Sequence, residues 1–393
     1  MSPTVYPKFS IKGKALLPIV QGGMGVGVSA HRLAGAVARA GAVGTIASID
    51  LRHHHPDLME QAGKRCDKET LDAINLVALD REIRMALETA QGGGLVAVNV
   101  MKAVAEHAAY VRQACESGAE AIVMGAGLPL DLPEMAADHP DVALIPILSD
   151  VRGVSVLLKK WMRLKKFGSS GRLPDAIVIE HPRYAGGHLG ATRIEDVGDA
   201  RFDFKNVLEG VFELFGELGI ARERIPVIVA GGVNTHEKFA GLMAMGASAV
   251  QLGTPFAVTE EGDAHPNFKK VLAEAKPEDI VTFMSVAGLP ARAVKTPWLV
   301  NYLKREHKLQ ACAKADRERC TAGLHCLIQC GLRDGIARAG QFCIDTQLAA
   351  ALKGDIRKGL FFRGSENLPF GSAIRSVGEL IDYLLTGVKP VPA

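Results

Sequence analysis

Residues 176–190 read AIVIEHPRYAGGHLG, an apolar run of the kind that forms a buried strand, followed at once by a glycine-rich turn that carries His188. Paired glycines allow a backbone to approach a bulky anionic ligand without Cβ clashes. A histidine beside them can serve as acid, base or hydrogen-bond donor near neutral pH. Taken alone, the stretch also fits a tight turn with an incidental surface histidine.

The same pattern recurs further along the chain. Residues 227–235 (VIVAGGVNT) again end a strand-like run in two glycines, and residues 249–255 (AVQLGTP) end a third run. Consecutive strand ends of this kind match the phosphate site of a (β/α)8 barrel, which is formed by the loops after its last two strands. The chain contains neither G-x-G-x-x-G nor G-x-x-x-x-G-K-[ST], so Rossmann and Walker sites are not supported.

The spacing of apolar runs predicts an α/β fold, specifically a TIM barrel. Segments with helical periodicity separate most of the runs, which indicates parallel strands covered on both faces. The alternative is a doubly wound open sheet. Eight runs are expected to form strands: Leu16–Val20, Ala42–Ile46, Leu95–Val100, Ala121–Met124, Val142–Leu148, Ala176–Glu180, Val227–Ala230 and Ala249–Leu252.

Composition favours a soluble enzyme. Of the 393 residues, 48% are hydrophobic, which is enough for a large core, and the formal net charge of +3 argues against an electrostatically driven nucleic-acid binder. No apolar run is long enough for a transmembrane helix, so no membrane contact is expected. Residues 1–6 lack the apolar core of a signal peptide, and a cytoplasmic location is therefore expected.

Four motifs in order resemble a known family. They are PIVQGGM at 18–24, AGGH at 185–188, AGGV at 230–233 and QLGT at 251–254. Together they are similar to the nitronate monooxygenase (2-nitropropane dioxygenase-like) flavoproteins, whose barrel and motifs the enoyl-acyl-carrier-protein reductase II enzymes share. The resemblance covers roughly residues 14–260 and implies FMN at the carboxyl ends of the strands.

The resemblance also implies roles for single residues, all of them before residue 260. His188 matches the histidine placed beside the flavin, and Asn99 matches a flavin-contacting asparagine, although an asparagine there is also a common strand-end turn residue. The cofactor-binding residues expected on this basis are Gly22, Gly23, Met24, Asn99, Glu180, Gly187, Gly231, Gly232, Gln251, Gly253 and Thr254.

The chain departs from the simple pattern in two places. Residues 51–90 form a long, charged, helical insertion, whose length suggests a lid or an oligomer contact. Residues 261–393 form a mostly helical extension that follows the FMN-binding barrel of residues 14–260, and it holds five of the seven cysteines. We expect the protein to be a homo-oligomer.

The clustered cysteines are expected to bind metal, because thiols in a reducing compartment read as ligands rather than disulfides. Cys320, Cys326, Cys330 and Cys343 resemble a cysteine-bearing extension of some family members, and four thiolates suit a [4Fe–4S] cluster or structural zinc. Buried free thiols are the remaining alternative. Cys312 is the cysteine of this cluster that is not expected to bind the metal, and His325 could replace one thiolate.

Several functions stay open. The first is oxidation of an alkyl nitronate, a small-molecule substrate, by FMN with O2 as acceptor. The second is an NAD(P)H-dependent reductase of enoyl thioesters or quinones on the same barrel. In a third, an FMN and iron–sulfur reductase would pass single electrons to a redox partner protein. A non-enzymatic flavin-binding scaffold or sensor is the fourth. The cysteine segment separates these functions, because a plain oxygenase needs no one-electron relay.

Overall fold

The computed structural model describes residues 6–63, 66–168, 171–316, 320 and 326–391. At its centre eight parallel strands close into a barrel, which confirms the predicted TIM barrel and excludes the open sheet. The predicted runs correspond to these strands, with ends that differ by a few residues. In order around the barrel they are β3 (Ile19–Gln21), β4 (Val43–Ala47), β5 (Leu95–Met101), β6 (Ala121–Gly125), β7 (Ala143–Leu148), β8 (Ile177–Glu180), β10 (Val227–Ala230) and β11 (Ala249–Leu252).

Alternation of side chains along the strands builds two separate cores. Ala97 and Val123 belong to a cluster inside the barrel, whereas their neighbours Val98 and Ile122 pack outward under the helices. Both faces of each strand are therefore buried, and this is why the strands appear in the sequence as continuous apolar runs.

A short hairpin fills one end of the barrel. Its strands, β1 (Phe9–Ile11) and β2 (Lys14–Leu16), place Phe9 and Ile11 in the interior cluster. The Nζ of Lys14 donates to Glu120 Oε1 at 2.7 Å, just before β6 begins, so the hairpin lies at the amino ends of the strands. The opposite end, where the carboxyl ends of the strands meet, is left for a site.

Helices surround the barrel, and the last of them comes from the far end of the chain. α14 packs against both α8 and α1, so the chain beyond residue 260 also contributes to the outer layer. The covering helices are α1 (His31–Arg39), α3 (Lys68–Ala90), α4 (His107–Glu116), α5 (Leu132–Met135), α6 (Val151–Trp161), α7 (Phe204–Glu217), α8 (His236–Ala244) and α14 (Val377–Thr386).

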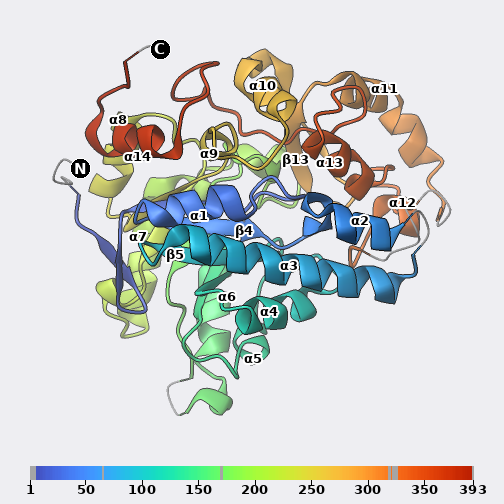
Figure 1. The fold of residues 1–393 in the computed structure, drawn as a ribbon. Helices are drawn as coiled ribbons and strands as arrows, with labels where there is room; N and C mark the ends of the chain where they lie inside the picture. The colour runs from blue at the N-terminus through green and yellow to red at the C-terminus, as the bar shows by residue number, and fades with distance from the viewer. Residues whose placement is uncertain (1–5, 64–65, 169–170, 317–319, 321–325, 392–393) are drawn as a thin grey trace.

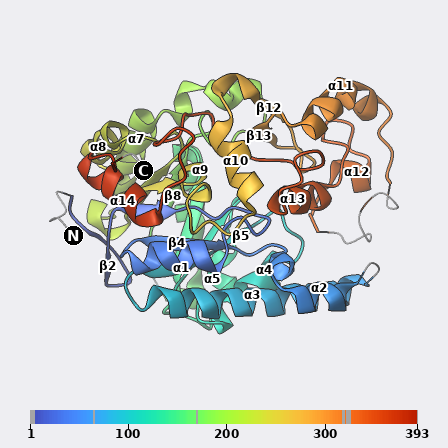
Figure 2. The same cartoon turned by 45° about the horizontal axis from the view of Figure 1, so that its top comes forward.

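The predicted insertion at 51–90 is helical, as expected, and most of it has a place in the barrel. α3 packs against α1 and α4 and lies alongside α1 in both views (Figures 1 and 2). It therefore takes the position of the helix that joins β4 to β5. Only the short α2 (Pro56–Ala62) and the turn before it are additional.

The remaining elements form a layer over the carboxyl ends of the strands. A small antiparallel sheet pairs β13 (Pro290–Val294) with β12 (Ile280–Met284) on one side and with β9 (Gly187–His188) on the other. The accompanying helices are α9 (Thr254–Ala257), α10 (Pro266–Glu274), α11 (Pro297–Ala311), α12 (Gly331–Asp334) and α13 (Ile344–Leu352). Within the described residues, no helix has the length and apolar character needed to cross a membrane.

Candidate active site

A cavity of about 600 Å³ lies at the carboxyl ends of the barrel strands. Its volume is within the range usual for cofactor and substrate sites. Every residue expected at the site lines this one cavity: Gly22, Gly23, Met24, Asn99, Glu180, Gly187, His188, Gly231, Gly232, Gln251, Gly253 and Thr254. The barrel thus brings together residues that are far apart in sequence, and their individual roles toward a cofactor remain predictions.

The ends of β10 and β11 form a group of unpaired main-chain donors. The N–H groups of Gly231, Gly232, Gly253 and Thr254 have no hydrogen-bond partner among the described residues. Gly231 and Gly232 have φ of +111° and +76°, a region that L side chains rarely adopt. Four free N–H groups at one edge of a cavity suit an anion such as a phosphate, so this edge fits the phosphate group of FMN.

The ends of β3 and β5 approach each other closely. A Cβ added to Gly23 would lie 2.3 Å from the Cβ of Asn99, so only glycine allows this approach. The Asn99 amide donates to the Val123 carbonyl at 3.3 Å, which fixes the side chain at the cavity wall. Asn99 therefore lies within strand β5, with its side chain bonded to the neighbouring strand, and is not a turn residue.

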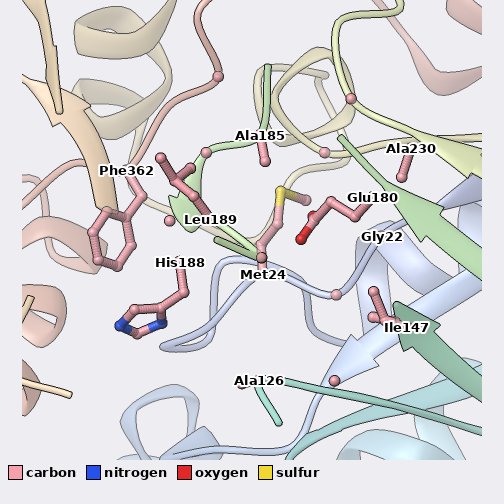
Figure 3. A pocket seen from close by; sticks show the side chains of 18 of the residues that line it. Gly22, Met24, Ala126, Ile147, Glu180, Ala185, His188, Leu189, Ala230 and Phe362 are labelled. Atoms are coloured by element: carbon pink, nitrogen blue, oxygen red, sulfur yellow. The ribbon is translucent and has the colours of Figure 1, made fainter. Parts of the chain in front are cut away.

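His188 is positioned by the small sheet rather than by the barrel alone. Ala291 of β13 is its partner in the ladder, and its Nε2 lies 3.0 Å from the Ser285 Oγ. The Phe362 ring lies beside it, with the ring centres 5.9 Å apart (Figure 3). The histidine is half-buried and lines the cavity. Burial lowers its pKa to about 4, so the imidazole is neutral at pH 7.

Glu180 ends β8 and points into the same cavity (Figure 3). Burial raises the pKa of its carboxyl to about 7, because it disfavours the charged form. At neutral pH this carboxyl is poised between its two protonation states.

Part of the cavity wall comes from residues that the sequence interpretation missed. Leu360, Phe362, Arg363 and Gly364 of the extension also line the cavity, whereas every residue expected to contact FMN lies before residue 260. The N–H of Gly364 donates to the Thr254 Oγ1 at 3.1 Å, which joins the extension to the end of β11. The apolar run at 359–362 was the available signal, but nothing in its pattern indicates which surface it covers.

The cysteines are brought partly together. Cys320, Cys326 and Cys343 line a second, small cavity of about 40 Å³ together with the carboxylates of Asp50 and Asp345. Burial and the nearby carboxylates raise the pKa of the Cys326 thiol well above its usual value. Cys330 is buried outside this cavity, Cys312 is exposed, and His325 lies outside the described residues.

Among the described residues, which include all four of the proposed ligands, no group of three or more His, Cys, Asp or Glu side chains is placed to hold a metal ion. Cys326 and Asp345 line the larger cavity as well, so the cysteine segment forms part of the wall between the two cavities.

The sequence matches a family model described as nitronate monooxygenase over residues 9–387. A "Probable nitronate monooxygenase" of Bacillus subtilis (strain 168) is 28% identical over 304 residues, which cover 74% of this chain and 80% of that protein. A nitronate monooxygenase of Pseudomonas aeruginosa is 31% identical over 120 residues, or 30% of this chain and 31% of that protein.

Two solved structures share the fold. FabK from Thermotoga maritima superposes with a TM-score of 0.64 at 22% identity, covering 94% of this chain and 91% of that one. A nitroalkane oxidase from Streptomyces ansochromogenes gives a TM-score of 0.59 at 22% identity, covering 94% of each chain. At this level of identity the likeness concerns the fold.

Proposed function

The chain belongs to the nitronate monooxygenase family, and from this premise we propose that it is an FMN-dependent oxidoreductase that oxidises alkyl nitronates with O2. The observation that supports this most is a single cavity with unpaired N–H groups at one edge and His188 at another. An anionic cofactor and an anionic substrate both find donors there.

The residues suit FMN in two respects. Gly231, Gly232, Gly253 and Thr254 would hold the phosphate through their main-chain N–H groups, and Asn99 offers an amide that is both donor and acceptor. When bound, FMN supplies the redox chemistry, while the protein supplies position and electrostatics.

The side chains around the cavity have separable tasks. Neutral His188 can hydrogen-bond a substrate oxygen, and Glu180 can hold or release a proton near pH 7. Phe362 and Leu360 add apolar side chains to the cavity wall, and the Phe362 ring lies beside the histidine. These roles predict a substrate with one polar, oxygen-bearing end and an apolar chain.

The apolar wall is also the observation that favours a second candidate, the NAD(P)H-dependent reduction of enoyl thioesters or quinones. Leu327, Ile344, Leu348, Leu360 and Phe362 all face the cavity from the extension, and such a surface suits an acyl chain. FabK shares the fold, so the fold is compatible with this alternative.

The third candidate, in which Cys320, Cys326, Cys330 and Cys343 hold a [4Fe–4S] cluster or zinc, has less support. It rests on the clustering of the cysteines in the sequence and on the small cavity that three of them share. We keep it as a hypothesis to be tested by metal analysis, and we derive no reaction step from it. A homo-oligomeric state and a redox partner protein likewise remain predictions.

Oxygen consumption distinguishes the first two candidates. FMN-loaded protein is mixed in air with an alkyl nitronate, and in a parallel reaction with NADH or NADPH and an enoyl thioester. Nitronate-dependent consumption of O2 without any pyridine nucleotide supports the proposal. Oxidation of NAD(P)H that requires the thioester, with no response to nitronate, would replace it with the reductase.

A further inference from the structure

Ser285 lies directly behind His188, outside the cavity. It is fully buried in the turn between β12 and β13 and does not line the cavity. Its N–H donates to the Leu289 carbonyl, and its own carbonyl accepts from the N–H of Gly340, both at 2.9 Å. The position of its hydroxyl is therefore set by a closed turn and by the segment that packs on it.

Among the described residues, the hydroxyl of Ser285 has two hydrogen-bond neighbours. The Ser285 Oγ accepts from the Ala287 N–H at 3.3 Å and lies 3.0 Å from the His188 Nε2. A hydroxyl has one hydrogen and two lone pairs, and a buried O–H without an acceptor is unfavourable. Among the described residues, the acceptor available to the Ser285 hydrogen is the Nε2 of His188.

This assignment decides which nitrogen of His188 carries hydrogen. The ring is neutral near pH 7, because burial lowers its pKa to about 4, so one nitrogen is a donor and the other an acceptor. If Nε2 accepts from Ser285, then Nδ1 bears the hydrogen. Nδ1 has no hydrogen-bond partner among the described residues, and it is not a buried atom. Because His188 lines the cavity, Nδ1 is open to the cavity.

We propose that Ser285 is a positioning residue that fixes His188 in the Nδ1–H form, so that the histidine presents a hydrogen-bond donor to the substrate instead of a base. The inference rests on the proposed function, because the group it would meet is an oxygen of the nitronate. A nitronate has already lost its α-proton and carries negative charge on oxygen, so a donor suits it. The parent nitroalkane would need a base, and Nε2 is occupied.

The tautomer can be measured directly by NMR on protein labelled with 15N-histidine. Long-range 1H–15N correlations distinguish a protonated from an unprotonated ring nitrogen, and the signals of His188 are identified by their loss in His188→Gln. We expect FMN-loaded wild-type protein at pH 7 to show Nδ1–H and an unprotonated Nε2. A wild-type spectrum with Nε2–H overturns the inference, whether or not any variant folds.

Ser285→Ala tests whether Ser285 is the cause of the fixed tautomer of His188. Without the hydroxyl, the fixed tautomer should give way to a mixture that includes Nε2–H, and kcat with nitronate should fall by about tenfold, as expected for one lost hydrogen bond. An unchanged tautomer in Ser285→Ala contradicts the role of the serine. The matched control is Ser248→Ala, whose hydroxyl accepts from the Val227 N–H at the other end of the barrel. It should leave both readouts unchanged.

The two proposals fail in different ways. The spectra are recorded without substrate, so Nδ1–H in the wild type together with its loss in Ser285→Ala supports the inference even if nitronates are not oxidised. Conversely, nitronate oxidation by a protein whose His188 carries Nε2–H would preserve the proposed function and remove the inference.

Discussion

His188 and Ala291 are partners in an antiparallel ladder, so a strand that follows the barrel in sequence holds the histidine that the barrel presents to the cavity. The site is therefore built jointly by the barrel and by the layer over it. A histidine held in this way has a defined ring position, which catalysis through a single imidazole requires.

Replacing that imidazole should separate binding from turnover. His188→Ala is expected to retain FMN and to lower kcat by about 10²–10⁴-fold, the usual contribution of a positioned acid–base or hydrogen-bonding group. Flavin content and steady-state rates with nitronate measure the two effects. His307→Ala, which changes an exposed histidine on α11, serves as the control. Wild-type turnover in flavin-loaded His188→Ala would exclude a catalytic role.

The phosphate assignment is best tested at Gly253. A Cβ there meets only the Met24 side chain, with its Sδ at 3.7 Å, so the protein has room for it while the cavity loses space beside the free N–H groups. Gly253→Ala should fold normally and bind FMN at least about tenfold more weakly, a loss of roughly 1.4 kcal/mol.

Fluorescence titration of apoprotein with FMN measures the change caused by Gly253→Ala. Gly241→Ala is the matched control, because a Cβ on this α8 glycine meets nothing within 4 Å. Equal affinity in Gly253→Ala and wild type would show that the phosphate does not lie at this edge. Gly231 is a poorer test, because its φ of +111° would add backbone strain to any effect on the cofactor.

Glu180 predicts a pH dependence of stability in the apoprotein. Its folded-state pKa of about 7 is above the ordinary value of 4.5, so the folded state binds more protons than the unfolded state between these values. The free energy of unfolding of the wild type should therefore fall, relative to Glu180→Gln, as the pH rises from about 5 to 8. The full difference is up to about 3 kcal/mol, less where water in the cavity screens the charge. Urea unfolding of both proteins across this range measures it, and parallel curves would refute the raised pKa.

The cysteine hypothesis makes a compositional prediction. If Cys320, Cys326, Cys330 and Cys343 hold a cluster, anaerobically purified protein should contain about four irons and four sulfides per chain. Cys326→Ala should abolish them, while Cys312→Ala, at an exposed position, should not. Stoichiometric zinc would indicate a structural site instead. FMN-loaded protein without either metal would leave the four residues as thiols.

Much of the barrel could be predicted from the sequence because each strand is buried on both faces. A run such as 227–230 must then be apolar throughout, and the glycines that follow mark where the backbone turns into the cavity. The β1–β2 hairpin was missed because its strands have three residues each, too short for any periodicity to be visible.

The layer over the cavity could not be predicted, for a different reason. The pairing of β9 with β13, and the contact of Gly364 with Thr254, join segments about a hundred residues apart. Neither contact leaves a local pattern in the sequence. The position of Ser285 behind His188 likewise follows only from the folded turn. The cysteines were visible as a cluster in the sequence, but their arrangement in space was not: Cys320, Cys326 and Cys343 line one small cavity, and Cys330 lies outside it.

The central claim, oxidation of alkyl nitronates at a bound flavin, is tested most directly by anaerobic mixing. FMN-loaded protein is combined with an alkyl nitronate in the absence of O2 and of pyridine nucleotide, and the visible absorbance of the flavin is followed. We expect the absorbance of the oxidised flavin to be lost after nitronate is added and to return when air is admitted. Unchanged absorbance with nitronate, in protein whose flavin is readily bleached by NADH or NADPH, would contradict it.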